Sequence, residues 1–244
     1  MAVIVRRDGD RLVEDGHRVR FILPRRPNAC VDRDVGGRQV RHFNVAKGDL
    51  SNEEARQYAA RLADAPARAM AVFDVDRADL HPARTPARAS FAFSIMPGRR
   101  ITSDWCVVAQ YNARPTEGER WRIPPLALGL KTLKGREVLY AAVATFPTAG
   151  SQEQGRAVAL PGGGSAPIRR DRSHRIGIEF VDGGGGDGRL KVTVDGETLV
   201  AYDGPTGYAN FAGCFFSYGL HRSPWCPGGE DLAVSFETLR EGRA

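Results

Sequence analysis

Cysteine and histidine are the residue types here with the widest chemical use, and neither follows a metal-binding pattern. The four cysteines are Cys30, Cys106, Cys214 and Cys226. No Cys-x-x-Cys pair occurs, and His17, His42 and His81 have no partner at a metal-ligand spacing. We therefore expect no metal cluster. Cys214 and Cys226 are close enough in sequence to form a disulfide.

His221 is the side chain best suited to acid or base chemistry. It lies near the end of a strand-like run that begins at Phe215. An unperturbed imidazole titrates at about pH 6.5, so His221 could serve as base or acid; the alternative is an ordinary surface histidine. Gln110 and Asn112 lie two residues apart in another strand-like run. Their amides can bind a carboxylate, or simply hydrogen-bond within a sheet, but cannot act as a base near neutral pH.

Glycine-rich and basic stretches predict no nucleotide or nucleic-acid site. Neither Gly162–Gly164 nor Gly183–Gly186 is followed by a helix pattern or a Lys-Ser/Thr pair, which a phosphate cradle needs. The net charge of +6 is too mild to argue for nucleic acid. The densest basic run, Arg169–Arg175, is either a solvated loop or a surface that captures a polyanion.

The apolar segments are short. No run of about 18 or more apolar residues occurs, so we expect no transmembrane helix and no membrane insertion. The N-terminus turns charged at Arg6, after too few apolar residues for a signal-peptide core. We therefore expect a cytoplasmic protein that is released by lysis, or one displayed on a particle or virion.

One short surface helix is predicted. Ser51 followed by Glu54 is a capping box, and the alanine-rich stretch 55–64 propagates a helix. Gly48 precedes this segment and Pro66 follows it.

Most of the remaining chain predicts strands. These are short runs rich in Val, Ile and Phe, at 3–6, 18–23, 40–45, 69–75, 90–96, 105–111, 126–131, 137–145, 175–181, 190–194, 199–202, 214–220 and 232–239. In one of them Ile176, Ile178 and Phe180 share a face at period two. Asp195-Gly196 is typical of a two-residue hairpin turn. The pattern predicts an all-β fold, an antiparallel β-sandwich or barrel.

No repeat or linker divides the chain into several domains. We expect residues 1–40 to form an N-terminal extension or edge strands, and residues 41–244 to form one domain.

Four segments share their order and spacing with a known family. They are Arg41–Asp49; Trp105–Asn112 with Pro124–Leu128; Gly188–Gly196 with Tyr202–Tyr208; and Phe215–Arg222. The second resembles a strand with a Gln-x-His motif, and the fourth resembles a late Tyr-Phe-Lys-x-Gly-x-Tyr-Arg strand. Together they resemble the heparin-lyase-I-like polysaccharide lyases. The resemblance implies a concanavalin-A-type (lectin-like) β-jelly-roll that recognises carbohydrate.

These lyases cleave uronic-acid polymers by β-elimination, and the resemblance implies roles for particular residues. A neutral or cationic group offsets the sugar carboxylate, a base removes the neighbouring proton, and an acid protonates the leaving oxygen. Asn112 stands where the family has its histidine, Ser217 where it has lysine, and His221 where it has tyrosine. The usual base is therefore missing. His221 remains as candidate base or acid, with Gln110 and Asn112 as candidates to neutralise the carboxylate.

Aromatic rings and arginines supply the candidates for sugar binding, because aromatic faces stack on sugar rings. The candidates are Tyr111, Arg114, Trp121, Tyr218, Arg222 and Trp225. Trp121 lies between two arginines and Trp225 lies in a loop, so both are expected to be exposed. Core packing is the alternative for these rings, and it is the expectation for Trp105.

Two functions are the main hypotheses. The first is a non-catalytic protein that binds a polysaccharide, with an acidic capsular or cell-surface glycan as the expected ligand and a neutral one as the alternative. It would act alone, as an oligomer or within a virus-like particle or spike. The second is an active lyase with His221 as base or acid. A sandwich that never binds sugar is a third. No cofactor is expected; a structural calcium is the alternative, with Asp182, Asp187 and Asp203 near glycine-rich turns.

Overall fold

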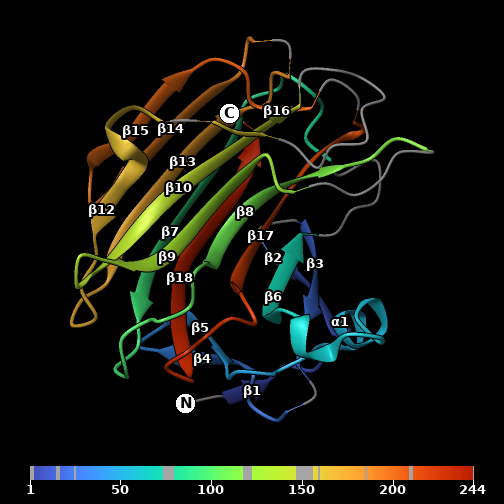
Figure 1. The fold of residues 1–244 in the computed structure, drawn as a ribbon, viewed down its shortest axis with the longest axis vertical. Coiled ribbons are helices and arrows are strands. Elements are labelled where there is room, and N and C mark those ends of the chain that lie inside the picture. The colour runs from blue at the N-terminus through green and yellow to red at the C-terminus, as the bar shows by residue number, and fades with distance from the viewer. Residues whose placement is uncertain are drawn as a thin grey trace.

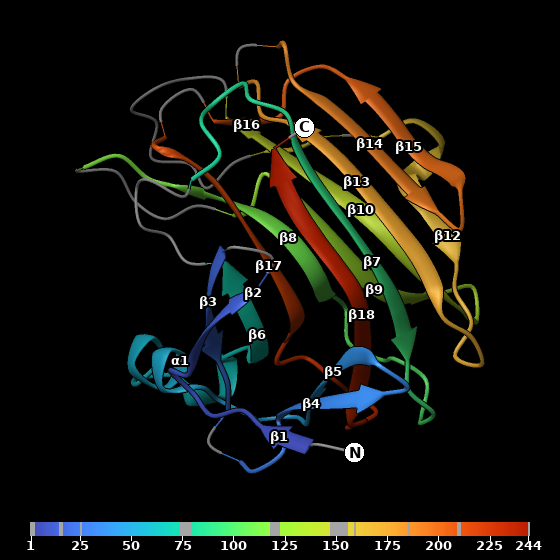
Figure 2. The same cartoon turned by 180° about the vertical axis from the view of Figure 1, so that it is seen from behind.

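The structure, a computed structural model, describes residues 3–14, 17–24, 26–73, 80–117, 123–146, 156–158, 160–184, 186–208 and 211–243. Two β-sheets pack face to face (Figure 1, and Figure 2 from behind). Sheet A contains, in spatial order, β1 (Val3–Val5), β4 (Cys30–Val35), β5 (Arg38–Val45), β18 (Leu232–Arg243), β7 (Ala87–Ile95), β13 (His174–Val181), β14 (Arg189–Val194) and β15 (Glu197–Asp203).

Sheet B is the larger sheet. Its spatial order is β11 (Arg156–Val158), β10 (Arg136–Phe146), β9 (Leu126–Leu133), β8 (Cys106–Arg114), β17 (Gly213–Arg222), β6 (Ala67–Phe73), β3 (His17–Ile22) and β2 (Arg11–Glu14). Two short strands, β12 (Ser165–Pro167) and β16 (Gly207–Tyr208), also pair with β10. All the strand pairs described are antiparallel except β10–β16. The predicted all-β antiparallel sandwich is confirmed.

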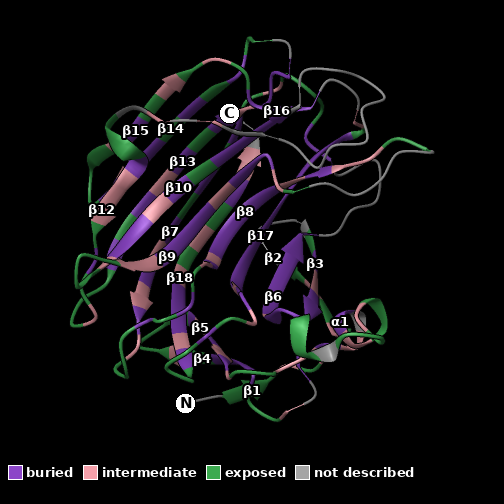
Figure 3. Cartoon of the chain, viewed as in Figure 1, coloured by how far each residue is buried: buried purple, intermediate pink, exposed green. Residues whose placement is uncertain are grey.

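The hydrophobic core lies between the two sheets, because alternate residues of each strand point inward. On β13, Ile176, Ile178 and Phe180 are buried as the period-two pattern predicts, and Phe91 and Phe93 of β7 pack into the same cluster. Figure 3 shows buried segments along the central strands and exposed residues at the outer turns. Each sheet therefore keeps an outer face on which polar side chains can be held by a rigid framework.

The predicted helix is present but shorter. Helix α1 covers Asn52–Gln57, and a 3₁₀ turn, η1 (Leu62–Asp64), follows it; a second 3₁₀ turn, η2, covers Pro161–Gly164. Ser51 caps α1 by accepting a hydrogen bond from the amide of Glu54. The Glu54 carboxylate bonds the Ser51 hydroxyl and pairs with Arg68 in sheet B, so the helix start is joined to the sheet.

The predicted strands are all found, but β2, β4, β11, β12 and β16 were not predicted. Strand β4 shows no clear alternation because Asp32 is buried, where it pairs with Arg6 and Arg41. Strands β1 and β4 lie at one edge of sheet A, and β2 and β3 at one edge of sheet B. No helix in the described part of the chain is long and apolar enough to cross a membrane.

The disulfide suggested by the sequence is not formed. All four cysteines are free and buried. Cys214 lies near the start of β17 and Cys226 beyond its end, so an extended strand separates them. The eight steps from Cys214 to Arg222 alone span about 26 Å at about 3.3 Å per residue, far beyond disulfide reach.

Candidate functional site

Gln110, Asn112 and Ser217 form a hydrogen-bonded polar row on the outer face of sheet B. The Gln110 Nε2 donates to Oδ1 of Asn112 at 2.9 Å, and the Asn112 Nδ2 donates to Oγ of Ser217 at 2.9 Å. Strands β8 and β17 set this geometry, since Gln110 and Ser217 lie directly opposite each other in register. Their neighbours Tyr111 and Phe216 point into the core, which leaves the amides on the outer face.

His221 lies on the same outer face, further along β17. The register with β6 is continuous from Ser217 to Arg222, so the two side chains four residues apart share a face, and His221 lies opposite Arg68. Gly219, between them, has φ +133°, and a Cβ there would meet the Ala69 carbonyl oxygen at 2.3 Å. A glycine is therefore required where β17 shifts its register against β8.

His221 is held in its neutral form. Burial lowers the pKa of His221 well below its usual value, and the nearby Arg68 guanidinium lowers it further. Its Nε2 has no hydrogen-bond partner within the described residues. The imidazole meets the indole of Trp105 edge-to-face, with ring centroids 5.1 Å apart. Trp105, expected in the core, is instead half-buried beside His221.

Arg68 is a cation in this site that the sequence analysis did not single out. Its Nε lies 2.9 Å from Oε1 of Glu54, which is fully buried. This ion pair fixes the guanidinium opposite His221. The sequence analysis began this strand at residue 69, so Arg68 was left outside it. In the structure β6 begins at Ala67, and alternation along the strand points Arg68 to the face opposite that of the buried Ala67 and Ala69.

Tyr140 and Lys131 extend the face across β9 and β10, and the sequence analysis missed both. Tyr140 lies opposite Gly129 of β9, and Gly129 lies opposite Val107 of β8. Val107 lies opposite His221 of β17, so these residues form one line across the four strands. A Cβ on Gly129 would meet Cζ of Tyr140 at 2.5 Å, so the phenol ring lies over this glycine. Lys131 Nζ lies 4.6 Å from the ring centroid. A glycine inside a predicted strand was the signal for this close approach.

An apolar cluster borders the polar row. Phe215, which lies opposite Asn112, packs with Ile22, Val72 and Leu80. The polar residues of this face therefore extend from Asn112 toward His221, and the apolar cluster around Phe215 ends them on the other side.

Tyr111 and Tyr218, predicted to bind substrate, lie in the core. Tyr111 is 0% exposed and stacks on Phe180, with centroids 5.4 Å apart. Tyr218 is 1% exposed, packs edge-on against Phe43 of sheet A, and accepts a hydrogen bond from Arg41. Tyr111 directly follows Gln110, and Tyr218 directly follows Ser217. Because successive side chains of a strand point to opposite faces, both rings point into the core. The structure corrects both assignments.

Of the two predicted arginines, only Arg114 has a side chain on the outer face. Arg114 shares the facing of Gln110 and Asn112 and is half-buried at the end of β8. Arg222 is fully buried, and its Nη1 donates to the carbonyl of Glu230 at 2.6 Å. Arg222 therefore supports the loop that follows β17 and cannot contact a ligand, which corrects its assignment.

Trp225 is exposed as predicted, with 68% of its surface accessible. Its loop is anchored by Glu230, whose carboxylate accepts hydrogen bonds from the Cys226 thiol and from the hydroxyl and amide of Thr102. Burial opposes ionisation, but these bonds hold the pKa of Glu230 at about 2. The amide of Ser223 donates to the Trp105 carbonyl, which joins this loop to the His221 end of the face. Trp121 lies outside the described residues.

Three of the four arginines in the basic run 169–175 pair with carboxylates. Arg170 bonds both carboxylate oxygens of Glu137 at 2.7 Å, and Arg169 pairs with Asp171. Arg172 pairs with Asp195 at 2.8 Å. These arginines have partners, which fits a structural loop better than a polyanion site.

The carboxylates considered for calcium do not converge. Asp182 is buried, whereas Asp187 pairs with Arg84 and Asp203 pairs with Arg189 at the surface. Within the described residues, no group of three or more His, Cys, Asp or Glu side chains could hold a metal ion. This donor set does not fit a calcium ion, so we derive no role for one.

No protein-family model and no curated protein matches the chain. Solved structures do match it. One match is the family 7 alginate lyase A1-II′, solved in complex with substrate as a variant with one His replaced by Asn and one Tyr by Phe. Its TM-score is 0.63 at 12% identity, and the match covers 93% of both chains. The endo-β-1,4-glucuronan lyase from the fungus Trichoderma reesei has a TM-score of 0.59 at 14% identity, covering 96% of this chain and 90% of its own.

A third match is the alginate lyase PA1167 from Pseudomonas aeruginosa, with a TM-score of 0.55 at 15% identity, covering 87% of this chain and 86% of its own. At these identities the likeness concerns the fold. The narrower likeness to heparin lyase I stays a prediction. The chain has the jelly-roll fold of polysaccharide lyases, with a polar face on the sheet that carries the motif residues.

Proposed function

We propose that the protein binds an acidic polysaccharide on the outer face of sheet B. The observation that carries the proposal is the polar row of Gln110, Asn112 and Ser217 on one face with His221 and Arg68. Asn112, Arg68 and His221 are half-buried, whereas Gln110 and Ser217 are buried and fix the Asn112 amide by their hydrogen bonds. An amide and a guanidinium held in this way on a rigid sheet suit sugar hydroxyls and carboxylates.

Binding without turnover is the favoured form of this function. The position that resembles the family histidine holds Asn112, which cannot take up a proton near neutral pH. A variant of alginate lyase A1-II′ with one His changed to Asn and one Tyr to Phe was solved with its substrate bound, so in that protein the changes do not abolish binding. By analogy, Asn112 is compatible with retention of a sugar polymer. A binding role on a particle, spike or oligomer needs no turnover, and we include display of this kind in the proposal.

β-Elimination is the second candidate, and His221 is the observation that favours it. Its imidazole is neutral, as a base must be, and it faces the fixed cation of Arg68. Tyr140 lies on the same cross-strand line and carries a phenol that can donate a proton. In this mechanism His221 would remove the proton beside the sugar carboxylate while Gln110 or Asn112 binds that carboxylate.

One pair of measurements separates the two functions. The protein is mixed with alginate and with glucuronan, and the ultraviolet absorbance of the unsaturated product is followed while affinity is measured by calorimetry. We expect binding with a flat absorbance trace, and weaker binding for Asn112→Ala than for the control Ser94→Ala on sheet A. Product formation that disappears in His221→Ala would instead establish the lyase. A folded protein that binds neither polymer and no acidic glycan on an array contradicts both.

A further inference from the structure

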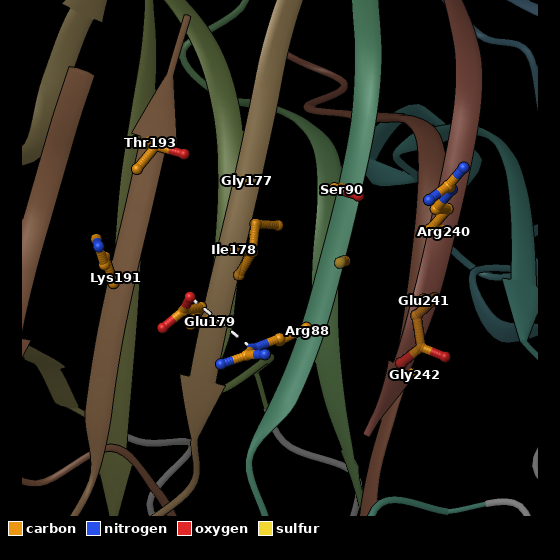
Figure 4. Close-up of a pocket in the computed structure, with 11 residues that line it drawn as sticks. Arg88, Ser90, Gly177, Ile178, Glu179, Lys191, Thr193, Arg240, Glu241 and Gly242 are labelled. Atoms are coloured by element: carbon orange, nitrogen blue, oxygen red, sulfur yellow. Dashed lines mark ion pairs between the residues drawn. The ribbon is translucent and has the colours of Figure 1, made fainter. Parts of the chain in front are cut away.

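A pocket of about 360 Å³ lies on the outer face of sheet A (Figure 4). It is on the opposite side of the sandwich from the polar row, which lies on sheet B. Two adjacent cross-strand lines build it. The first runs Thr193, Gly177, Ser90, Arg240, and the second runs Lys191, Glu179, Arg88, Gly242. Four strands, β14, β13, β7 and β18, therefore contribute to one depression.

The depression exists because small side chains are surrounded by long ones. Gly177 lies between Thr193 and Ser90, and its strand keeps a regular register on both sides, so no turn or bulge requires a glycine there. A Cβ at Gly177 would meet the Thr193 hydroxyl oxygen at 2.6 Å. The absence of a side chain at Gly177 thus gives the Thr193 hydroxyl room to lie over the floor, with the Ser90 hydroxyl on the other side of the glycine. A glycine within a regular strand is typical of a place where a ligand approaches the backbone.

The pocket carries a net positive charge. Arg88 and Glu179 form an ion pair at 3.8 Å, with both side chains more than half exposed, as the dashed line in Figure 4 marks. Lys191 and Arg240 lie on opposite sides of the floor, and neither has an ion-pair partner in the part of the chain that the structure describes. Glu241 also lines the pocket, but it is buried and its carboxylate pairs with His81. On the outer face the three cations therefore exceed the one exposed carboxylate, Glu179, by two charges, so the pocket attracts anions.

From this arrangement we infer a second carbohydrate site on sheet A, which takes a carboxylate-bearing sugar unit. The ring lies over Gly177, its hydroxyls bond Ser90, Thr193 and Glu179, and its carboxylate pairs with Lys191 or Arg240. The volume is within the range of small-molecule sites, about 300–1,000 Å³. The inference shares only its ligand class with the proposed function, because it uses the other face of the molecule.

Amide shifts of the intact chain test the inference, with alginate and glucuronan trisaccharides as probes. Gly177 and Gly242 report on sheet A, whereas Gly129 and Gly219 report on sheet B. We expect both pairs of signals to move. If only Gly129 and Gly219 respond, the sheet A site is refuted and the proposed function stands. If only Gly177 and Gly242 respond, the proposed function fails and this inference stands.

A charge variant with a matched control completes the test. The double variant Lys191→Met/Arg240→Met should weaken the sheet A affinity roughly 5- to 10-fold. Arg189→Met, an exposed arginine of the same strand outside the pocket, should change it less than about 2-fold. Equal losses in both variants, or displacement by inorganic sulfate at matched ionic strength, would mean general charge attraction and overturn the sugar site.

Discussion

The Nδ2 of Asn112 lies 2.9 Å from Oγ of Ser217 on the neighbouring strand, and this bond ties the polar row together. We expect Ser217→Ala to leave one Asn112 donor without its acceptor and to weaken binding of acidic oligosaccharides by about 1 kcal/mol, or roughly 5-fold. Calorimetry against the control Ser94→Ala checks it. Equal affinity in the two variants would remove the polar row from the binding site.

His221 should stay neutral in the folded protein down to acidic pH. Burial and Arg68 hold its pKa well below its usual value, so the unfolded chain gains a proton below about pH 6.5 while the folded chain does not. Stability contributed by His221 is therefore full above about pH 6.5 and falls as the solution is acidified below it. His221→Gln should lose less stability than the wild type between pH 7 and pH 5, in denaturant titrations at each pH. Identical losses would contradict a depressed pKa.

Asp182 should make the protein less stable at alkaline pH. Burial raises its pKa to about 8, so the carboxyl is protonated in the fold when it is already ionised in the unfolded chain. Stability is complete below the unfolded pKa of about 3.9 and falls as pH rises toward 8. Asp182→Asn should remove this loss of stability. Between pH 4 and pH 8 the free energy of unfolding of the variant should therefore rise by a few kcal/mol relative to that of the wild type. Parallel unfolding curves across that range would argue against a raised pKa.

Glu230 should stabilise the loop that carries Trp225. Its pKa of about 2 lies below the unfolded value, so the stabilisation is complete above about pH 4.5 and is lost as pH falls through 2. Glu230→Gln should cost about 2–3 kcal/mol at pH 7 and much less near pH 2, because Thr102 and Cys226 lose a charged acceptor. Thermal unfolding at both pH values measures it. Asp231→Asn, a neighbouring exposed residue, serves as the control.

Gly129 and Tyr140 should be coupled. Gly129→Ala places a methyl group where the phenol ring lies, and we expect a loss of about 1–3 kcal/mol. In a Tyr140→Ala background the same change meets open space and should be close to neutral. A double-mutant cycle from chemical denaturation gives the coupling energy. Additive effects would show that the ring does not rest on Gly129.

Period-two patterns allowed most of the strands to be predicted, because the side chains of Ile176, Ile178 and Phe180 differ from their neighbours in polarity. Strand β4 was not predicted, because ion pairs with Arg6 and Arg41 allow the charged side chain of Asp32 to be buried, and this removes the alternation of polar and apolar residues. In β8 five of the six residues from Cys106 to Tyr111 are buried, and an irregularity at Val107/Ala109 interrupts the alternation. The facing of Gln110 against Tyr111 therefore could not be read from sequence.

The candidate site was predictable only where a motif marks it. Gln110, Asn112 and His221 were identified because two segments resemble lyase strands, and the structure brings them to one face. Tyr140 and Arg68 belong to that face through pairings between strands distant in sequence, which a single sequence does not display.

The central position of β18 has a consequence for biosynthesis. Among the strands that the structure describes, hydrogen bonds join β1, β4 and β5 to the rest of sheet A only through β18, the last of these strands in chain order. A ribosome must therefore deliver residues 232–243 before the early strands find their neighbour. Until then β5 presents an unsatisfied backbone edge, and a nascent chain stalled before this point would be prone to self-association.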